Sequence, residues 1–263
     1  MSIIDQAFKR LKGKGQCVLI PFVVAGDPDL ATTETLVEQM GQAGADIIEL
    51  GVPYSDPLAD GPTIQAASLR ALKGGANLKA VFSLAKNLKG KTVPLVIMTY
   101  YNPVYRHGLQ AFAKDCQECA IAGVIIPDLP PEEAGPWVQE ARKVKVDTIF
   151  LTAPTSSPER IQRVSRVSRG YLYHVSVTGV TGVRGELSAD LEPAVRRIKE
   201  ISNKPVAVGF GISTPEQVQE VGRFADGIIV GSAIVRIVEE ARGSENRVRR
   251  VESFISSLSA ARR

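Results

Sequence analysis

Eight short apolar segments, most of them rich in valine and isoleucine, recur along this 263-residue chain and constrain its fold more than any other feature. They span residues 17–24, 46–51, 94–100, 123–127, 147–151, 170–176, 205–210 and 226–230. Most are almost continuously apolar, which is typical of parallel strands that are covered on both faces. Segments with helical periodicity lie between several of them, at 30–43, 158–167, 191–201 and 215–221.

Eight strands that alternate with helices over ~250 residues predict an α/β fold, a (β/α)8 TIM barrel. We expect this barrel to occupy residues 1–263 as a single domain, because no shift in composition marks a boundary. A doubly wound open sheet is the alternative that the pattern leaves open.

The net charge of +4 comes from residues 242–263, which hold six arginines and two glutamates. Apolar residues follow helical spacing in this segment, at Val248, Val251, Phe254, Ile255 and Leu258. We therefore predict a C-terminal amphipathic helix that packs on the barrel with its arginines in water, and no nucleic-acid or membrane partner. No signal peptide is visible and three cysteines do not form a disulfide framework, so a cytoplasmic location is expected.

Two intervals between strands are longer than the others, and they include the polar loops 51–62 and 176–190. Loops that follow strands build the active sites of barrels, so we expect chemistry there. Glu49 shares a strand face with Ile47, and burial inside the barrel would raise its pKa and suit it to proton transfer. The competing interpretations are a salt-bridged glutamate at the barrel rim for Glu49 and a cap of the next helix for Asp60.

The last two strands end in glycine-containing segments, at Gly209-Phe210-Gly211 and Val230-Gly231-Ser232. Glycines let backbone N–H groups approach an anion, and barrels often bind phosphate after strands 7 and 8. Thr214 stands where a dinucleotide-binding fingerprint would need its third glycine. These segments therefore predict a phosphate site and not a dinucleotide site.

Other reactive residue types carry weaker signals. Cys116 and Cys119 lie within a helical run and are interpreted as structural. His107 and His174 stand apart from any set of ligands with metal-binding spacing, so no metal is expected.

Seven motifs in this order resemble the tryptophan synthase alpha subunit family over essentially the whole chain. They are PFVVAGDPD (21–29), IELGVPYSDPLADGP (48–62), YYNP (100–103), PDLPPEE (127–133), GVTG (179–182), GFGIS (209–213) and GSAIV (231–235). The resemblance implies a (β/α)8 barrel that cleaves indole-3-glycerol phosphate to indole and glyceraldehyde 3-phosphate in L-tryptophan biosynthesis. It also implies a beta-subunit partner in an alpha2beta2 complex, with pyridoxal phosphate only in that partner and no cofactor in this chain.

The resemblance further assigns roles to residues of this sequence. The two catalytic carboxylates fall on Glu49 and Asp60, and Asp56 with Thr181 would communicate with the partner subunit. The substrate would contact Phe22, Tyr100, Ile125, Tyr173, Thr181, Gly182, Phe210, Gly211, Gly231 and Ser232. Val-Thr-Gly occurs twice, at 177–179 and 180–182, and the second copy is aligned with the family because it keeps Tyr173 in register.

The main hypothesis is therefore a lyase that works with a separate beta subunit. A stand-alone indole-3-glycerol phosphate lyase is the alternative among enzymes. A non-catalytic barrel that binds a phosphorylated metabolite and regulates a partner is the alternative of another class, and the intact pair Glu49 and Asp60 argues against it.

Overall fold

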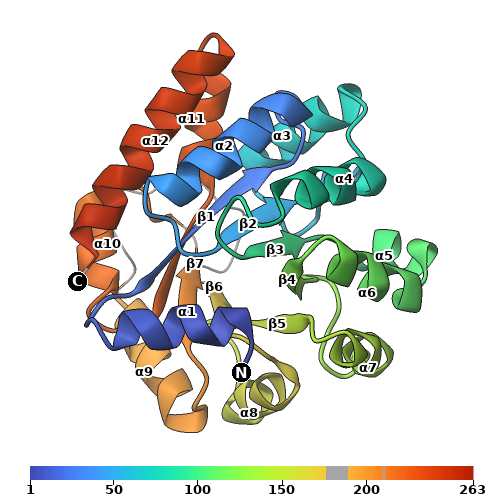
Figure 1. The fold of residues 1–263 in the computed structure, drawn as a ribbon. Helices are drawn as coiled ribbons and strands as arrows, with labels where there is room; N and C mark the ends of the chain where they lie inside the picture. The colour runs from blue at the N-terminus through green and yellow to red at the C-terminus, as the bar shows by residue number, and fades with distance from the viewer. Residues whose placement is uncertain (176–188, 210, 263) are drawn as a thin grey trace.

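The structure is a computed structural model that describes residues 1–175, 189–209 and 211–262. Within these residues, eight parallel strands close into a barrel in the order of the sequence, with β1 paired to β8 (Figure 1). The strands are β1 Val18–Val24, β2 Ile48–Gly51, β3 Leu95–Met98, β4 Ile121–Ile125, β5 Asp147–Thr152, β6 Leu172–Val175, β7 Val206–Gly209 and β8 Gly227–Val230. Each lies in or directly beside a predicted segment, and the closure excludes the doubly wound open sheet.

Helices surround the barrel (Figure 1). They are α1 Ile3–Lys12, α2 Leu30–Gln42, α3 Pro62–Lys73, α4 Leu78–Leu88, α5 Tyr101–His107, α6 Leu109–Glu118, α7 Gly135–Lys143, α8 Pro158–Val167, α9 Leu191–Ile201, α10 Pro215–Val221, α11 Ser232–Glu240 and α12 Ser244–Ala261. Helices α8 and α10 begin at proline behind a capping side chain, Ser157 and Thr214. The long interval after β2 is filled by two helices, α3 and α4, and not by loops alone.

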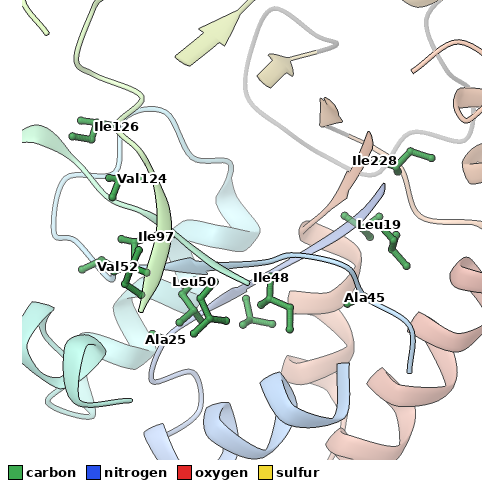
Figure 2. Packing of buried hydrophobic residues seen from close by; sticks show 14 of the residues in the cluster. Leu19, Ala25, Ala45, Ile48, Leu50, Val52, Ile97, Val124, Ile126 and Ile228 are labelled. Carbon is green, nitrogen blue, oxygen red and sulfur yellow. The ribbon is translucent and has the colours of Figure 1, made fainter. Parts of the chain in front are cut away.

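Alternation of side chains along the strands divides the core into two layers. Ile48 and Leu50 of β2 point outward, toward the helices, and Figure 2 shows part of this outer layer, including Leu50 and its register partner Ile97 of β3. Ile47 belongs to a separate inner cluster to which all eight strands or the residues beside them contribute. Glu49 lies on the same face as Ile47, so the barrel interior receives a carboxyl group.

Helix α1 closes the N-terminal end of the barrel, which the sequence patterns did not predict. Its apolar face, Ile4, Ala7, Phe8 and Leu11, belongs to the same cluster as the inward-facing strand residues. The ring of Phe8 packs on that of Tyr171, with ring centroids 5.5 Å apart. Because apolar side chains fill the barrel at this end, we expect a functional site at the opposite, C-terminal end of the strands.

The C-terminal helix α12 packs on α2, α10 and α11 and buries Val251, Ile255 and Leu258, as predicted. The expectation that its arginines lie in water is wrong for Arg262. Its side chain is 11% exposed and binds the buried carboxylate of Asp46, which also accepts a hydrogen bond from the backbone N–H of Leu19. A carboxylate taken out of water requires a cation, and the end of the chain supplies one. No described helix is both long and apolar enough to cross a membrane.

Candidate active site

Glu49 stands near the end of β2, on the inner face of the barrel, and is fully buried. Its Oε1 accepts a hydrogen bond of 2.8 Å from the Tyr171 hydroxyl, and its Oε2 has no partner within the part of the chain that is described. No described cation forms an ion pair with it, so the interpretation as a salt-bridged rim residue is not supported by these contacts.

Burial in this apolar layer raises the pKa of Glu49 from its usual 4.5 to about 8, and the hydrogen bond from Tyr171 lowers it in part. At neutral pH the side chain is therefore a neutral carboxylic acid that holds a transferable proton. Tyr171 was not among the residues singled out from the sequence, because the contact joins positions that are 122 residues apart.

Asp60 precedes α3 but does not cap it, because the N-cap is Gly61. Its Oδ2 accepts a 3.0 Å hydrogen bond from the Tyr100 hydroxyl, and its backbone carbonyl accepts one of 2.8 Å from the Gln65 side chain. Burial raises the pKa of Asp60 from 3.8 to about 6, less than that of Glu49. At neutral pH Asp60 is mostly ionised and can accept a hydrogen bond from an N–H group, whereas Glu49 is protonated.

Tyr100 links Asp60 to the surface of the site. Its hydroxyl oxygen also accepts a hydrogen bond of 3.1 Å from the backbone N–H of Ala59, and its ring stacks on that of Tyr54 at 5.1 Å between centroids. The Tyr54 hydroxyl in turn accepts a hydrogen bond from the Asn102 side chain. Tyr100 thus acts as a polar partner of Asp60 in this structure, in addition to the substrate contact that the resemblance implies for it.

A cavity of about 330 Å³ opens beside this network. It is lined by Tyr54, Asp56, Leu58, Ala59, Tyr100 and Asp128. Asp56 is exposed and its carboxylate accepts a hydrogen bond from the Ser55 hydroxyl. Leu58 is 92% exposed, so an apolar side chain stands in water at the mouth of the site.

Three of the expected substrate contacts lie on the inner side of the barrel. Phe22 is the register partner of Glu49, Ile125 is the last residue of β4, and Tyr173 faces inward from β6. Met98 and Leu151, which were not predicted, pack against the same inner cluster. Their place at the ends of β3 and β5 is the signal that could have found them. These side chains give the site apolar walls around a buried acid.

Two described segments fit the predicted phosphate site. Gly211 has a φ of +80°, which favours glycine, and a Cβ there would meet no neighbouring atom. Gly231 is the N-cap of α11 and Ser232 is its first residue, and no described side chain caps this helix. Its first N–H groups and the positive end of its dipole are thus available to an anion. Three expected contacts, Thr181, Gly182 and Phe210, lie outside the described residues.

A second hollow, of about 570 Å³, lies at the N-terminal end of the barrel. It includes Lys12, Ser202 and Gly222, which lie at the C-terminal ends of α1, α9 and α10. Basic side chains there offset the negative ends of the helix dipoles, which accounts for them without a ligand. Glu49 and Asp60 lie at the other end, at and beyond the C-terminal end of β2.

The remaining reactive residues form no site in the described part of the chain. Cys17, Cys116 and Cys119 are unpaired, and no group of three potential metal ligands is present among the described residues. His174 is buried and contacts Thr152, and burial lowers its pKa to about 4, so it is neutral. His107 binds Asp115 at the surface.

Comparison with known proteins gives one consistent result. A family model described as "Tryptophan synthase alpha chain" matches residues 8–263. A tryptophan synthase alpha chain of Thermoanaerobacter sp. (strain X514) is 46% identical over 259 residues, which cover 98% of each chain. That of Arabidopsis thaliana is 43% identical over 260 residues, covering 98% of this chain and 94% of the relative. A chain of the Mycobacterium tuberculosis tryptophan synthase structure superposes with a TM-score of 0.92 at 36% identity, covering 99% of this chain and 98% of that one.

Proposed function

The chain belongs to the tryptophan synthase alpha chain family, the lyase subunits that cleave indole-3-glycerol phosphate in tryptophan biosynthesis, and we propose that Glu49 and Asp60 perform this cleavage. The observation that carries the proposal is the different environment of the two carboxyl groups. One is fully buried with a pKa of about 8, and the other is partly exposed with a pKa of about 6. Two carboxyl groups whose pKa values are separated in this way suit an acid and an anion.

Glu49 moves the protons in the proposed mechanism. Its carboxylic acid protonates the indole carbon that bears the glycerol chain, which turns the ring into a leaving group. The resulting carboxylate accepts the proton of the adjacent glycerol hydroxyl as the carbon–carbon bond breaks. The bond's electron pair returns to the ring, the hydroxyl carbon becomes the aldehyde, and Glu49 ends the cycle protonated again.

Asp60 stabilises the charge that this protonation creates. The protonated ring carries a polarised N–H, and a fixed carboxylate that accepts its hydrogen bond lowers the energy of that state. Tyr100 donates to Asp60 in the free protein and so satisfies the carboxylate until the ring N–H arrives. Phe22, Ile125 and Tyr173 are the proposed walls for the ring, and Gly211, Gly231 and Ser232 the proposed contacts of the phosphate.

Glu49→Gln tests the mechanism. The amide keeps the shape of the side chain but has no acidic proton, so we expect indole formation to fall at least ~100-fold while substrate binding stays near normal. Single-turnover indole release together with equilibrium binding would separate the two effects. Activity within a few-fold of the unmodified protein would remove Glu49 from the mechanism.

Ser232→Asp tests the phosphate site. A carboxylate at the start of α11 would repel the phosphate, so substrate affinity should fall more than tenfold, about 1.4 kcal/mol. The temperature of unfolding should change little, because Ser232 is only partly buried. Unchanged affinity would mean that the phosphate binds elsewhere.

The proposed partner is a beta subunit in an alpha2beta2 complex, which would hold the pyridoxal phosphate, while this chain needs no cofactor of its own. Exposed Leu58 and Asp56 beside the site supply a surface for such contact. Asp56→Ala should weaken activation by the beta subunit more than it weakens the basal rate of the isolated chain. Equal losses in both assays would assign Asp56 to local catalysis or folding.

The single-domain organisation of residues 1–263 and a cytoplasmic location also remain proposals.

A further inference from the structure

An ion cluster outside the site joins three segments that carry proposed substrate contacts. Arg70 of α3 binds Asp27, in the loop after β1, and Glu239, near the end of α11. β1 carries Phe22, α3 directly follows the Asp60 loop, and α11 begins at Ser232. We call Asp27, Arg70 and Glu239 the brace.

The geometry of the brace depends on the guanidinium group. Nε and Nη2 of Arg70 donate to the two carboxylate oxygens of Asp27 at 2.8 and 2.9 Å, and Nη1 donates to Glu239 at 2.7 Å. The Asp27 side chain is 3% exposed, whereas that of Glu239 is 47% exposed. One planar group thus fixes a buried carboxylate on one side and a surface carboxylate on the other, which a lysine ammonium cannot do with the same geometry.

Helix α3 contributes small side chains to the apolar packing beneath the brace. Ala67 and Ala71 of α3 form a separate apolar cluster with Phe22, Val24 and Val235, among others. A Cβ on Gly26 would lie 2.5 Å from that of Ala76, so the loop after β1 already touches the turn after α3. Alanine side chains project little from α3, so the long Arg70 side chain adds a directional polar tie between α3 and α11.

We infer that Arg70 is a positioning residue which, through the brace, sets the separation between the indole end and the phosphate end of the substrate site. The inference rests on the proposed function, because it uses Asp60 and Ser232 as the two ends. A substrate that must contact both ends at once is sensitive to their separation, whereas a ligand that fills one end is not. A misplacement of about 1 Å can lower a rate about 100-fold.

The test compares the whole substrate with its two halves. In Arg70→Lys we expect kcat/KM for indole-3-glycerol phosphate to fall at least about tenfold, while the inhibition constants of indole and of glycerol 3-phosphate change less than twofold. Glu239→Gln leaves the buried Asp27–Arg70 pair intact, so it should fold normally, and it should lower kcat/KM about threefold. Arg160→Lys is the matched control, because Arg160 is 38% exposed and pairs with Glu132 on the other side of the barrel, and it should leave all three values unchanged.

A purely structural role predicts a different pattern. If the inhibition constants of both halves worsened in parallel with kcat/KM, or if folded Arg70→Lys and Glu239→Gln kept the unmodified kcat/KM, the positioning role would be refuted. Failure of the proposed function is separately visible. If Ser232→Asp does not weaken glycerol 3-phosphate inhibition, the phosphate end has been placed wrongly, whatever Arg70→Lys does.

Discussion

The free energy of unfolding of the Glu49→Gln variant, minus that of the unmodified protein, should increase as the pH rises. Burial raises the pKa of Glu49 from 4.5 to about 8, so the folded state binds this proton more tightly than the unfolded state does. A raised pKa contributes stability that is fully present below the unfolded value and is lost as pH rises through the folded value. Between pH 5 and 8, the unfolded chain releases the proton while the folded chain still largely holds it.

The magnitude follows from the two pKa values. With 4.5 unfolded and about 8 folded, ionisation of Glu49 favours the unfolded state by about 1 kcal/mol at pH 5 and about 4 kcal/mol at pH 8. The glutamine variant has no such term. Its free energy of unfolding, minus that of the unmodified protein, should therefore increase by about 3 kcal/mol between these pH values.

Urea unfolding of both proteins at several pH values from 5 to 8 measures this change. Other ionisable groups titrate in both proteins and cancel in the difference. The amide nitrogen takes the place of an unpartnered oxygen and can lower the variant's stability, but this offset is independent of pH. A difference that changes by less than about 1 kcal/mol over the range would refute the argument that burial keeps Glu49 protonated.

Further expectations concern activity and the chain end. In the unmodified protein, kcat/KM should fall above pH about 8 as Glu49 loses its proton, and below pH about 6 as Asp60 gains one. The substrate phosphate, with a pKa of about 6, also contributes to the fall on the acid side. Tyr171→Phe removes a hydrogen bond that lowers the pKa of Glu49, so the pH at which kcat/KM falls on the alkaline side should rise by about one unit. A shift of this fall to lower pH would contradict the assignment. Arg262→Ala leaves the buried Asp46 with only Arg10 as a cationic partner among the described residues, and the Arg10 side chain is 59% exposed. The free energy of urea unfolding should fall by about 1–3 kcal/mol, while indole formation should not change. A loss of stability no larger than that caused by an alanine substitution of an exposed arginine of α12 would contradict this.

The barrel could be predicted from the sequence because burial on both faces leaves a local mark. A strand covered by helices outside and by other strands inside is apolar at nearly every position, as in Val18–Val24. Local chemistry also marked the beginnings of α8 and α10, where serine or threonine precedes proline. The role of α1 was not predictable in this way, because its amphipathic pattern does not say that its apolar face fills the end of the barrel.

For the candidate site, the sequence could indicate the two carboxyl groups and the glycine segments after β7 and β8, but not the partners of the carboxyl groups. From the sequence alone, Asp60 could be either the cap of the next helix or a functional residue. The structure shows that the N-cap is Gly61 instead. The partners of the carboxyl groups depend on long-range contacts. Tyr171 and Glu49 are 122 positions apart in the sequence, and Tyr100 and Asp60 are 40 apart. No helical or strand periodicity links residues at such separations, so these contacts cannot be recognised from the sequence pattern.

The proposed chemistry and the stability of the fold make opposite demands on position 49. Glu49 lies among inward-facing residues that are apolar or aromatic, including Ile47, Ile125 and Tyr173, and an apolar residue at 49 would remove the cost of keeping a carboxyl group there. The same apolar surroundings hold the proton on Glu49 at neutral pH, because they favour the neutral form over the carboxylate. Lowering the pKa of Glu49, for example by a cation beside Oε2, would therefore relieve the pH-dependent loss of stability and remove the acid at the same time. We expect no single substitution in contact with Glu49 to improve stability at pH 8 through that pKa and preserve the rate of indole formation at pH 7.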